Sequence, residues 1–460
     1  MTKPAGINEA IGALRARFGA RLSTAAAVRE QHGKDESYHA PQAPDAVVFA
    51  QSEGEVIEIV RICATHGAPM IPFGVGTSLE GHVAALHGGI CVDLSGMNKI
   101  LHVNAADGDC VVEAGVTRKA LNEYLRDTGL FFAIDPGADA TIGGMAATGA
   151  SGTTTVRYGT MRENVLGLKA VMADGRVVRT RRRARKSSAG YDLTRLFVGS
   201  EGTLGIITEV TVKLHPVPEA ISAATCRFPD VVSAVNAVIA TIQSGLPVAR
   251  IELIDEAAVD HINRYSNLTL AVQPTLFLEF QGSEAGVREQ AQRFGEIASE
   301  YGASEFDWAT RTESRSKLWE ARHTAYYATL AMYPGKQGMP TDVCVPISRL
   351  AECIEETQRD LAASGIDAPI IGHVGDGNFH TLLIFDPSDP AEVERVKAFN
   401  QRLIARALAM DGTCTGEHGV GYGKLDFMQA EHGEALSVMR DLKLALDPGN
   451  LMNPGKVVRV

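Results

Sequence analysis

Two neighbouring glycine-rich stretches, residues 135–152 and 157–160, constrain the fold of this chain more than any other feature. Together they contain six glycines, with several alanines, serines and threonines between them. Such residues leave main-chain N–H groups exposed and allow a flat or extended ligand to lie against the backbone. A cluster of purely structural glycines is the alternative, but it would have to account for two separate loops. We therefore predict a segment that binds a ligand through its main chain.

The charge of the chain bears on what that ligand is and how it is held. The formal net charge is −11, which argues against nonspecific nucleic-acid binding because such binding requires a basic surface. A pyrophosphate would therefore be held by main-chain amides. The basic run at residues 181–186 lacks interleaved aromatic residues, so an exposed charged loop is favoured over a nucleic-acid site. A docking surface for an acidic electron acceptor is left open there.

Length and composition indicate a multidomain globular protein. The 460 residues predict two or three domains, and 46 glycines with 45% hydrophobic residues fit a loop-rich fold of helices and strands. The seven cysteines are scattered and never spaced as C-x-x-C, so neither a disulfide framework nor a ferredoxin-type cluster is expected. We predict a cytoplasmic location, with attachment to the inner face of a membrane as a variant, and no transmembrane segment.

The N-terminus shows apolar residues at helical spacing with arginines between them. These apolar positions are Ile7, Ile11, Leu14, Phe18 and Leu22. A first helix packed on its domain is favoured over a targeting segment.

A short glycine loop at residues 74–78 follows a predicted strand at residues 70–73. A Rossmann dinucleotide site needs G-x-G-x-x-G opening directly into a helix. Leu79 occupies the third glycine position, so NAD binding by this loop is disfavoured.

The pattern of helices and strands changes near a proline linker at residues 216–218. Before it, Thr117 is predicted to cap a helix that buries Leu121, Tyr124 and Leu125. After it, longer units of strand and helix predict an antiparallel sheet with helices on one face, forming a cap domain.

Two histidines, His373 and His380, flank a predicted tight turn at residues 375–378. In that hairpin Val374 would pair with Phe379, and His373 would face His380. Directly opposed residues hold their Cβ atoms roughly 4.5–5.5 Å apart, close enough for two imidazoles to share one metal ion. The pair makes half a metal site, and a structural role for both histidines is the alternative.

A second glycine-rich motif, residues 412–421, presents Glu417 and His418 side by side. Glu417 would supply the carboxylate that completes a set of two histidines and one carboxylate, with positions open for substrate. His418 would then remain as a base. An ordinary charged loop pair is the alternative.

Four motifs in the first half resemble the FAD-binding domain of the vanillyl-alcohol oxidase type. They are residues 72–78, 136–152, 157–164 and 199–205, in the same order over residues 41–218. The resemblance implies that the first two loops cradle the FAD pyrophosphate and that the later stretches line the isoalloxazine and adenine. The implied cofactor-binding residues are Pro72, Gly74, Val75, Gly76, Thr77, Ser78, Pro136, Gly137, Thr141, Gly143, Gly144, Ser151, Gly152, Tyr158, Glu201, Gly202, Ile206 and Ile207. Residues 74–78 contain no histidine to tether the flavin, so noncovalent FAD is implied.

The second half resembles the FAD-linked D-2-hydroxy acid dehydrogenases, closest to the cytochrome-linked D-lactate dehydrogenases. The motifs are residues 372–380, 412–421 and 446–456. The implied fold is α+β: a two-part FAD-binding domain of the vanillyl-alcohol oxidase type, an antiparallel α+β cap, and a C-terminal segment that returns to the FAD domain. The expected division is an N-terminal helical segment at 1–40, the FAD domain at 41–218, the cap at 219–410 and the C-terminal segment at 411–460.

The resemblance also implies roles for single residues. His373, His380 and Glu417 would hold a divalent metal, zinc or manganese. His418 would be the catalytic base, and Arg322 would bind the substrate carboxylate.

One departure from the family bears on the substrate. Relatives that act on D-2-hydroxyglutarate carry a lysine before a Tyr-Asp pair and an asparagine two residues after the second histidine. Here the corresponding places are residues 340–342, which read Pro-Thr-Asp, and Leu382. This departure favours a small monocarboxylate such as D-lactate.

The expected function is oxidation of D-lactate to pyruvate by hydride transfer to the flavin. Electrons would pass to an acceptor such as cytochrome c, a quinone or an electron-transfer flavoprotein. Oxidation of D-2-hydroxyglutarate or glycolate is the alternative within the family. A metal-dependent hydrolase and a non-catalytic flavin carrier are the alternatives from other classes.

Overall fold

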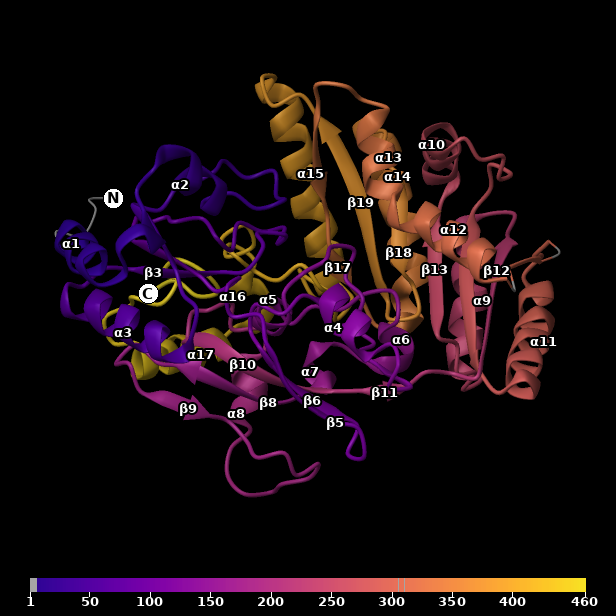
Figure 1. The fold of residues 1–460 in the computed structure, drawn as a ribbon. Coiled ribbons are helices and arrows are strands. Elements are labelled where there is room, and N and C mark those ends of the chain that lie inside the picture. The colour runs from indigo at the N-terminus through magenta and orange to yellow at the C-terminus, as the bar shows by residue number, and fades with distance from the viewer. Residues whose placement is uncertain (1–5, 305, 310) are drawn as a thin grey trace. The chain divides into compact units, whose positions relative to one another are not determined.

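The computed structural model describes residues 6–304, 306–309 and 311–460 (Figure 1). Its contacts divide the chain into two compact units. The first unit comprises Met1–Ser151, Gly159–Val217 and Glu417–Val460, and the second comprises Gly152–Tyr158 and Pro218–Gly416. Within the described ranges, the helices all fall short of the length and apolar character needed to cross a bilayer.

The first unit is built on three small sheets. A four-stranded sheet has the order β1-β2-β4-β3, with β2 and β3 both parallel to β4. A five-stranded antiparallel sheet has the order β5-β6-β10-β8-β9, and β11 pairs with β7. The strands are β1 (Leu22–Ser23), β2 (Ala46–Phe49), β3 (Met70–Phe73), β4 (Ile90–Asp93), β5 (Ile100–Asn104), β6 (Asp109–Glu113), β7 (Leu130–Phe131), β8 (Val165–Val171), β9 (Val177–Arg179), β10 (Ile206–Lys213) and β11 (His215–Pro216).

The helices of this unit are mostly short and lie between the strands. They are α1 (Ile7–Phe18), the 3-10 turn η1 (Gly19–Arg21), α2 (Ala26–His32), α3 (Glu53–Thr65), α4 (Arg118–Leu125), α5 (Ile142–Thr148), α7 (Met161–Asn164), α8 (Leu193–Phe197), α16 (Met428–His432) and α17 (Ala435–Leu446).

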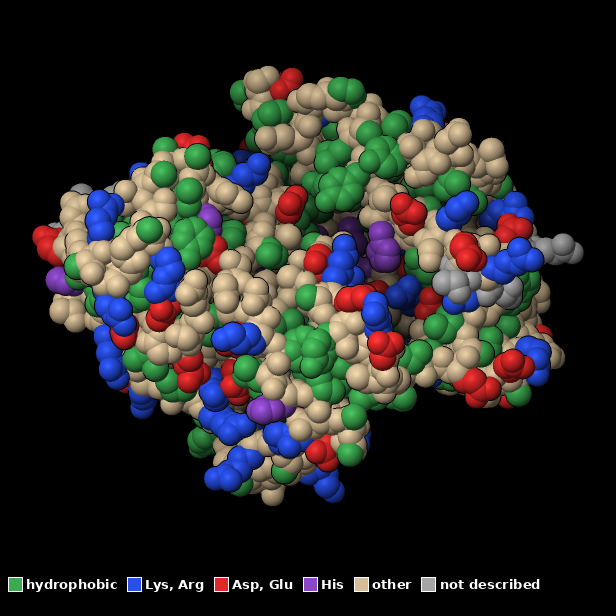
Figure 2. Space-filling view, in the orientation of Figure 1, with side chains coloured by type: hydrophobic (Ala, Val, Ile, Leu, Met, Phe, Trp, Pro, Cys, Tyr) green, Lys and Arg blue, Asp and Glu red, His purple; other side chains and the backbone are tan. Residues whose placement is uncertain are grey.

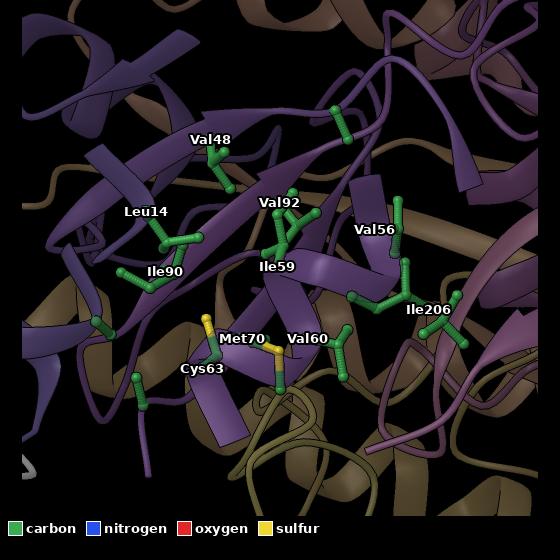
Figure 3. Packing of buried hydrophobic residues seen from close by; sticks show 14 of the residues in the cluster. Leu14, Val48, Val56, Ile59, Val60, Cys63, Met70, Ile90, Val92 and Ile206 are labelled. Atoms are coloured by element: carbon green, nitrogen blue, oxygen red, sulfur yellow. The ribbon is translucent and has the colours of Figure 1, made fainter. Parts of the chain in front are cut away.

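The N-terminal helix α1 is part of the core of the first unit, as the apolar spacing predicted. Its buried face packs with α3 and the four-stranded sheet, so that Leu14, Ile59 and Ile90 belong to one hydrophobic cluster (Figure 3). Helix α3 begins after Ser52, whose hydroxyl accepts a hydrogen bond from the Glu55 N–H.

Helix α4 departs from its predicted packing. The Thr117 hydroxyl caps it, and Leu121 and Leu125 are buried, but Tyr124 is 61% exposed. The helix has only eight residues. Its contact with the core is therefore limited to Leu121 and Leu125, which lie one turn apart on the same side of the helix. Tyr124 lies beside them and faces outward.

The basic run lies in the loop between β9 and α8, and residues 182–191 of that loop are exposed. Figure 2 shows Lys and Arg side chains gathered on the lowest part of the view, where Figure 1 places this loop. Arg183 attaches the loop to the β5–β6 turn, with Nη2 2.6 Å from an oxygen of Asp107 and 3.0 Å from one of Asp109. The prediction of an exposed charged loop is confirmed.

The second unit is an eight-stranded sheet with the order β15-β12-β14-β13-β18-β19-β16, and β17 also pairs with β19. Its strand pairs are all antiparallel, as predicted. The strands are β12 (Ala220–Arg227), β13 (Arg250–Ile254), β14 (Thr275–Gly282), β15 (Asp307–Ala309), β16 (Gln337–Pro340), β17 (Val343–Cys344), β18 (Ile370–His373) and β19 (Asn378–Phe385). The helices are α6 (Thr155–Tyr158), α9 (Val231–Gln243), α10 (Glu256–Ser266), α11 (Glu284–Glu300), α12 (Thr312–His323), α13 (Ala325–Ala331), the 3-10 turn η2 (Ile347–Arg349), α14 (Leu350–Ser364) and α15 (Pro390–Ala409).

Helices cover both faces of this sheet, so the prediction of helices on one face is wrong. On β14, Phe277 packs in a cluster with α10, α12 and α13. Phe280 contacts Phe294 of α11 instead. Residues 277 and 280 point to opposite faces because side chains alternate along a strand.

Candidate active site

One face of the second unit's sheet carries both predicted metal histidines. Strands β13 and β18 pair with Leu253 opposite Gly372, so Glu252 and His373 are the next residues to face each other. His380 lies on β19 on the same side of the sheet. This is the face covered by α10, α12 and α13, and it brings three titratable side chains together on paired strands.

The predicted register of the histidine hairpin is wrong by two residues. His373 pairs with Asn378 and not with His380. The cause lies at Gly377, whose φ is +82° and whose carbonyl accepts a 3.0 Å hydrogen bond from the Val345 N–H, outside the hairpin. A shift of two residues keeps both histidines on one face, because only an odd shift reverses side chains. Their ring centroids are 5.5 Å apart.

Each imidazole of the pair is oriented through Nδ1. His373 Nδ1 lies 2.8 Å from both carboxylate oxygens of Glu252. His380 Nδ1 lies 2.9 Å from the main-chain oxygen of Thr341. These oxygens can only accept, so Nδ1 donates in each ring, and Nε2 is the nitrogen that a neutral ring would offer to a metal ion.

Arg322 reaches the same cluster from α12. Its Nη2 donates to Glu252 Oε2 at 2.7 Å, and the residue is 6% exposed. Its Nε is buried and has no hydrogen-bond partner in the described part of the chain. A buried guanidinium with an unmet donor fits a carboxylate ligand.

Glu252 is the residue of this site that the sequence interpretation missed. It lies 1% exposed in β13 between apolar neighbours. The sequence signal that could have identified it is an acidic residue inside an otherwise apolar strand. A carboxylate buried in such a strand is stable only when it is paired.

Residues 413–416 lie against the hairpin within the second unit. Thr413 forms a bridge with Cys344, and the Thr415 hydroxyl donates to Asp342 Oδ2 at 2.7 Å. A Cβ on Gly416 would lie 2.3 Å from Asn378 Nδ2, so only glycine fits there. Glu417 follows by one peptide bond.

Glu417 and His418 themselves belong to the first unit. The Ser151 hydroxyl donates to Glu417 Oε2 at 2.5 Å, which holds one oxygen of the carboxylate. His418 Nδ1 lies 3.9 Å from Glu80 Oε1, which also lies 3.2 Å from Lys424 Nζ. Ser151, implied above as a cofactor residue, thus contacts the predicted metal carboxylate.

Glu201 holds the loop that follows His418. Its carboxylate accepts hydrogen bonds from the Val420 and Gly421 N–H groups at 2.7 and 2.8 Å, and it lies 3.2 Å from His82 Nε2. Burial acts to lower the pKa of His82, but the Glu201 carboxylate outweighs it and holds that pKa above its usual value. Glu201 has a φ of +53°, an uncommon conformation for a residue with a side chain.

The predicted FAD loops of the first unit lie close together. A Cβ on Gly74 would lie 2.4 Å from Thr141 Oγ1, and one on Gly202 would lie 2.6 Å from Pro72 Cγ. The Thr141 hydroxyl caps α5 by accepting from the Gly144 N–H.

The loop at residues 74–78 has the chemistry of an anion cradle. The main-chain N–H groups of Val75, Gly76, Thr77 and Ser78 donate to no acceptor among the described residues. Consecutive unmet N–H groups are the donors that a pyrophosphate needs. This loop therefore fits FAD.

The other predicted cofactor residues are placed as follows. Ile206 and Ile207 are buried in hydrophobic clusters, so their side chains serve packing. Gly143 packs against Ala114, while Pro136 is half-buried and Gly137 exposed. Gly152 and Tyr158 fall in the second unit, where the Tyr158 hydroxyl donates to Gln281 Oε1 at 2.5 Å.

Two family models match the chain. Residues 44–181 match an FAD binding domain, and residues 217–457 match the C-terminal domain of FAD linked oxidases. The fold is also that of 4-ethylphenol oxidase from Gulosibacter chungangensis, with a TM-score of 0.80 at 20% identity over 99% of this chain and 98% of that one. The predicted fold class is confirmed.

Curated relatives span nearly the whole chain. A probable mitochondrial D-lactate dehydrogenase of Danio rerio is 54% identical to this chain, and the match covers all of this chain and 93% of the relative. A mitochondrial D-lactate dehydrogenase [cytochrome] of Arabidopsis thaliana is 47% identical over 98% of this chain and 80% of its own length. The prediction of a cytoplasmic location is wrong, because these relatives are named as mitochondrial proteins. The chain is an FAD-dependent oxidoreductase and belongs to the family of FAD-linked oxidases, together with D-lactate dehydrogenases.

Proposed function

We propose that this protein oxidises D-lactate to pyruvate with noncovalent FAD and a divalent metal, and passes electrons to an acceptor such as cytochrome c, a quinone or an electron-transfer flavoprotein. The observation that carries the proposal is the cluster of Glu252, His373 and Arg322 on one sheet face. It combines a buried guanidinium, suited to a carboxylate, with an imidazole oriented as metal-binding histidines are. The names of the relatives support D-lactate as the substrate.

FAD would be held by the main-chain N–H groups of residues 75–78 and by the neighbouring loops at Thr141 and Gly202. When bound, it supplies the acceptor for the hydride of the substrate carbon. The protein's part is to hold the cofactor without a large basic patch, which the unmet N–H groups support.

His373, His380 and Glu417 would hold the metal, zinc or manganese. When bound, the metal supplies Lewis-acid polarisation of the 2-hydroxyl oxygen. The tautomers of both histidines support this assignment. Glu417 is one peptide bond, about 3.8 Å between Cα atoms, from Gly416, which packs on the hairpin residue Asn378.

Arg322 would bind and orient the substrate carboxylate through the N–H groups that Glu252 does not occupy. His418 would then remove the hydroxyl proton as a general base, a role that typically contributes about 10²–10⁴-fold in rate. His418 Nδ1 lies 3.9 Å from Glu80 Oε1, so the carboxylate can act on the imidazole through its charge.

A monocarboxylate is favoured by the pair of residues at the end of β16. Pro340 lies directly opposite Leu382, and Leu382 is 3% exposed. An apolar pair at these positions offers no cation for a second carboxylate, as D-2-hydroxyglutarate would need.

The test is anaerobic mixing of purified flavoprotein with D-lactate while the flavin absorbance is recorded. We expect rapid bleaching with D-lactate and slower bleaching with L-lactate, glycolate and D-2-hydroxyglutarate. Flavin bands that no 2-hydroxy acid bleaches would indicate a flavin carrier instead. Purified protein whose spectrum lacks flavin bands would favour the metal-dependent hydrolase.

A further inference from the structure

Glu252 is a buried carboxylate shared by two functional side chains. Its Oε2 accepts from Arg322 Nη2 at 2.7 Å, and both of its oxygens lie 2.8 Å from His373 Nδ1. All three side chains are nearly excluded from solvent, with exposed fractions of 1% for Glu252, 7% for Arg322 and 11% for His373. One carboxylate thus contacts a substrate-binding group and a metal ligand of the proposed function.

The guanidinium of Arg322 and a metal ion bound at His373 would repel each other. A guanidinium stays protonated in proteins, so Arg322 is a permanent cation. A divalent ion on His373 adds positive charge nearby, and buried charges are screened weakly by salt and water. The repulsion would weaken metal binding unless an anion lay between the two groups, and Glu252 is the carboxylate that contacts both.

We propose that Glu252 is a positioning residue that makes metal binding at His373 compatible with the buried cation of Arg322. It fixes the imidazole with Nδ1 as donor and offsets the guanidinium charge. The inference rests on the proposed function, because it assumes that His373 binds the metal. It predicts that losing Glu252 weakens metal binding more while Arg322 is a cation than when a neutral residue replaces Arg322.

The direct test uses Mn²⁺ alone. The flavin-loaded protein is freed of metal with a chelator and titrated with Mn²⁺ without substrate, and free Mn²⁺ is followed by its electron paramagnetic resonance signal. We expect Glu252→Gln to bind Mn²⁺ about 10–100-fold more weakly than the wild type, the usual effect of losing the partner of a metal-binding histidine. Asp255→Asn is the matched control, since among the described residues this buried acid, which directly follows β13, accepts hydrogen bonds from the main-chain N–H groups of Ala258 and Ile370 alone.

A double variant separates charge compensation from simple structural support. Arg322→Met alone should keep tight Mn²⁺ binding. In the Glu252→Gln background, Arg322→Met should restore the part of the lost affinity that is due to charge, because the uncompensated buried cation is gone. A purely structural role for Glu252 predicts that the double variant binds as weakly as Glu252→Gln or more weakly.

Each outcome has a defined meaning. His373-dependent Mn²⁺ binding that is equal in Glu252→Gln and the wild type would overturn this inference and leave the proposed function standing. Wild-type protein that binds no Mn²⁺, or binds it equally after His373→Ala, would overturn the metal site itself and the inference with it. If Glu252→Gln does not fold, Glu252→Asp carries the test: its shorter side chain cannot reach both partners, and affinity equal to the wild type would contradict the proposal.

Discussion

The two units contribute to the proposed chemistry in different ways. In the first unit the binding elements are loops, where main-chain N–H groups and closely packed glycines present the cradle at residues 74–78. In the second unit they are side chains on paired strands, where Glu252, His373 and Arg322 contact one another on one sheet face. The first arrangement is sensitive to added volume, and the second is sensitive to removed charge.

Glu201 and Glu252 illustrate the difference between two buried glutamates. Glu201 accepts from two main-chain N–H groups, so it holds the position of a loop. Glu252 contacts an imidazole and a guanidinium, so it sets the tautomer and charge of side chains. Four variants test how the two units differ, and they follow in order of decreasing expected effect.

The largest effect is expected for His418→Ala, which removes the proposed general base, a side chain of the first unit. Flavin reduction by D-lactate should slow by about 10²–10⁴-fold, because the proton acceptor is lost. FAD content should not change. Single-turnover absorbance measures both, with His432→Ala of α16 as the control. A normal reduction rate in His418→Ala would remove it as the base.

Gly143→Ala tests the sensitivity of the first unit to volume. The added Cβ would lie 2.5 Å from Ala114 Cβ and 2.8 Å from its carbonyl oxygen. We expect a loss of about 1–3 kcal/mol in the free energy of unfolding, as overpacking usually causes, together with weaker FAD retention. Gly12→Ala in α1 is the matched control, because nothing lies within 4 Å of its Cβ position. Equal stability of the two variants in denaturant would contradict close packing of the first turn of α5 against Ala114.

Asp255 directly follows β13 and is a second buried carboxylate to compare with Glu252. Its hydrogen-bond donors in the described part of the chain are main-chain N–H groups. Burial raises the pKa of Asp255 to about 7, against about 3.9 in an unfolded chain. The folded state therefore keeps a proton that the unfolded state loses, and the free energy of unfolding from this group falls as pH rises from about 4 to about 7. The slope is at most about 1.4 kcal/mol per pH unit, and it vanishes above pH of about 7.

Urea unfolding of the wild type and Asp255→Asn at several pH values measures this contribution. The difference between the two proteins should change with pH up to about 7 and then stay constant. A difference independent of pH between 5 and 7 would show that Asp255 is ionised throughout that interval.

The smallest effect is expected for Glu201→Gln. Its carboxamide offers one acceptor oxygen where two N–H groups now donate, so an unmet donor should lower the free energy of unfolding by about 1–3 kcal/mol. Flavin reduction should slow modestly because the loop after His418 is less well held. The exposed Glu9→Gln is the control, and a Glu201→Gln protein with wild-type stability and rate would show that the loop is held by other contacts.

Much of the fold followed from local patterns. The cap at Thr117 was predicted correctly because it depends only on neighbouring residues. The hairpin register failed because Gly377 pairs with Val345, a residue from another strand region. The division into four segments with separate roles stays a prediction.

The family, the glycine loops and the candidate ligands could be predicted from the amino-acid sequence, because each depends on residue types at short spacing. The contacts of Glu252 with both His373 and Arg322 became visible in the folded chain alone. The three residues come from separate elements, and a contact among them depends on strand pairing and helix packing. Long-range contacts of this kind leave no local pattern in a single chain.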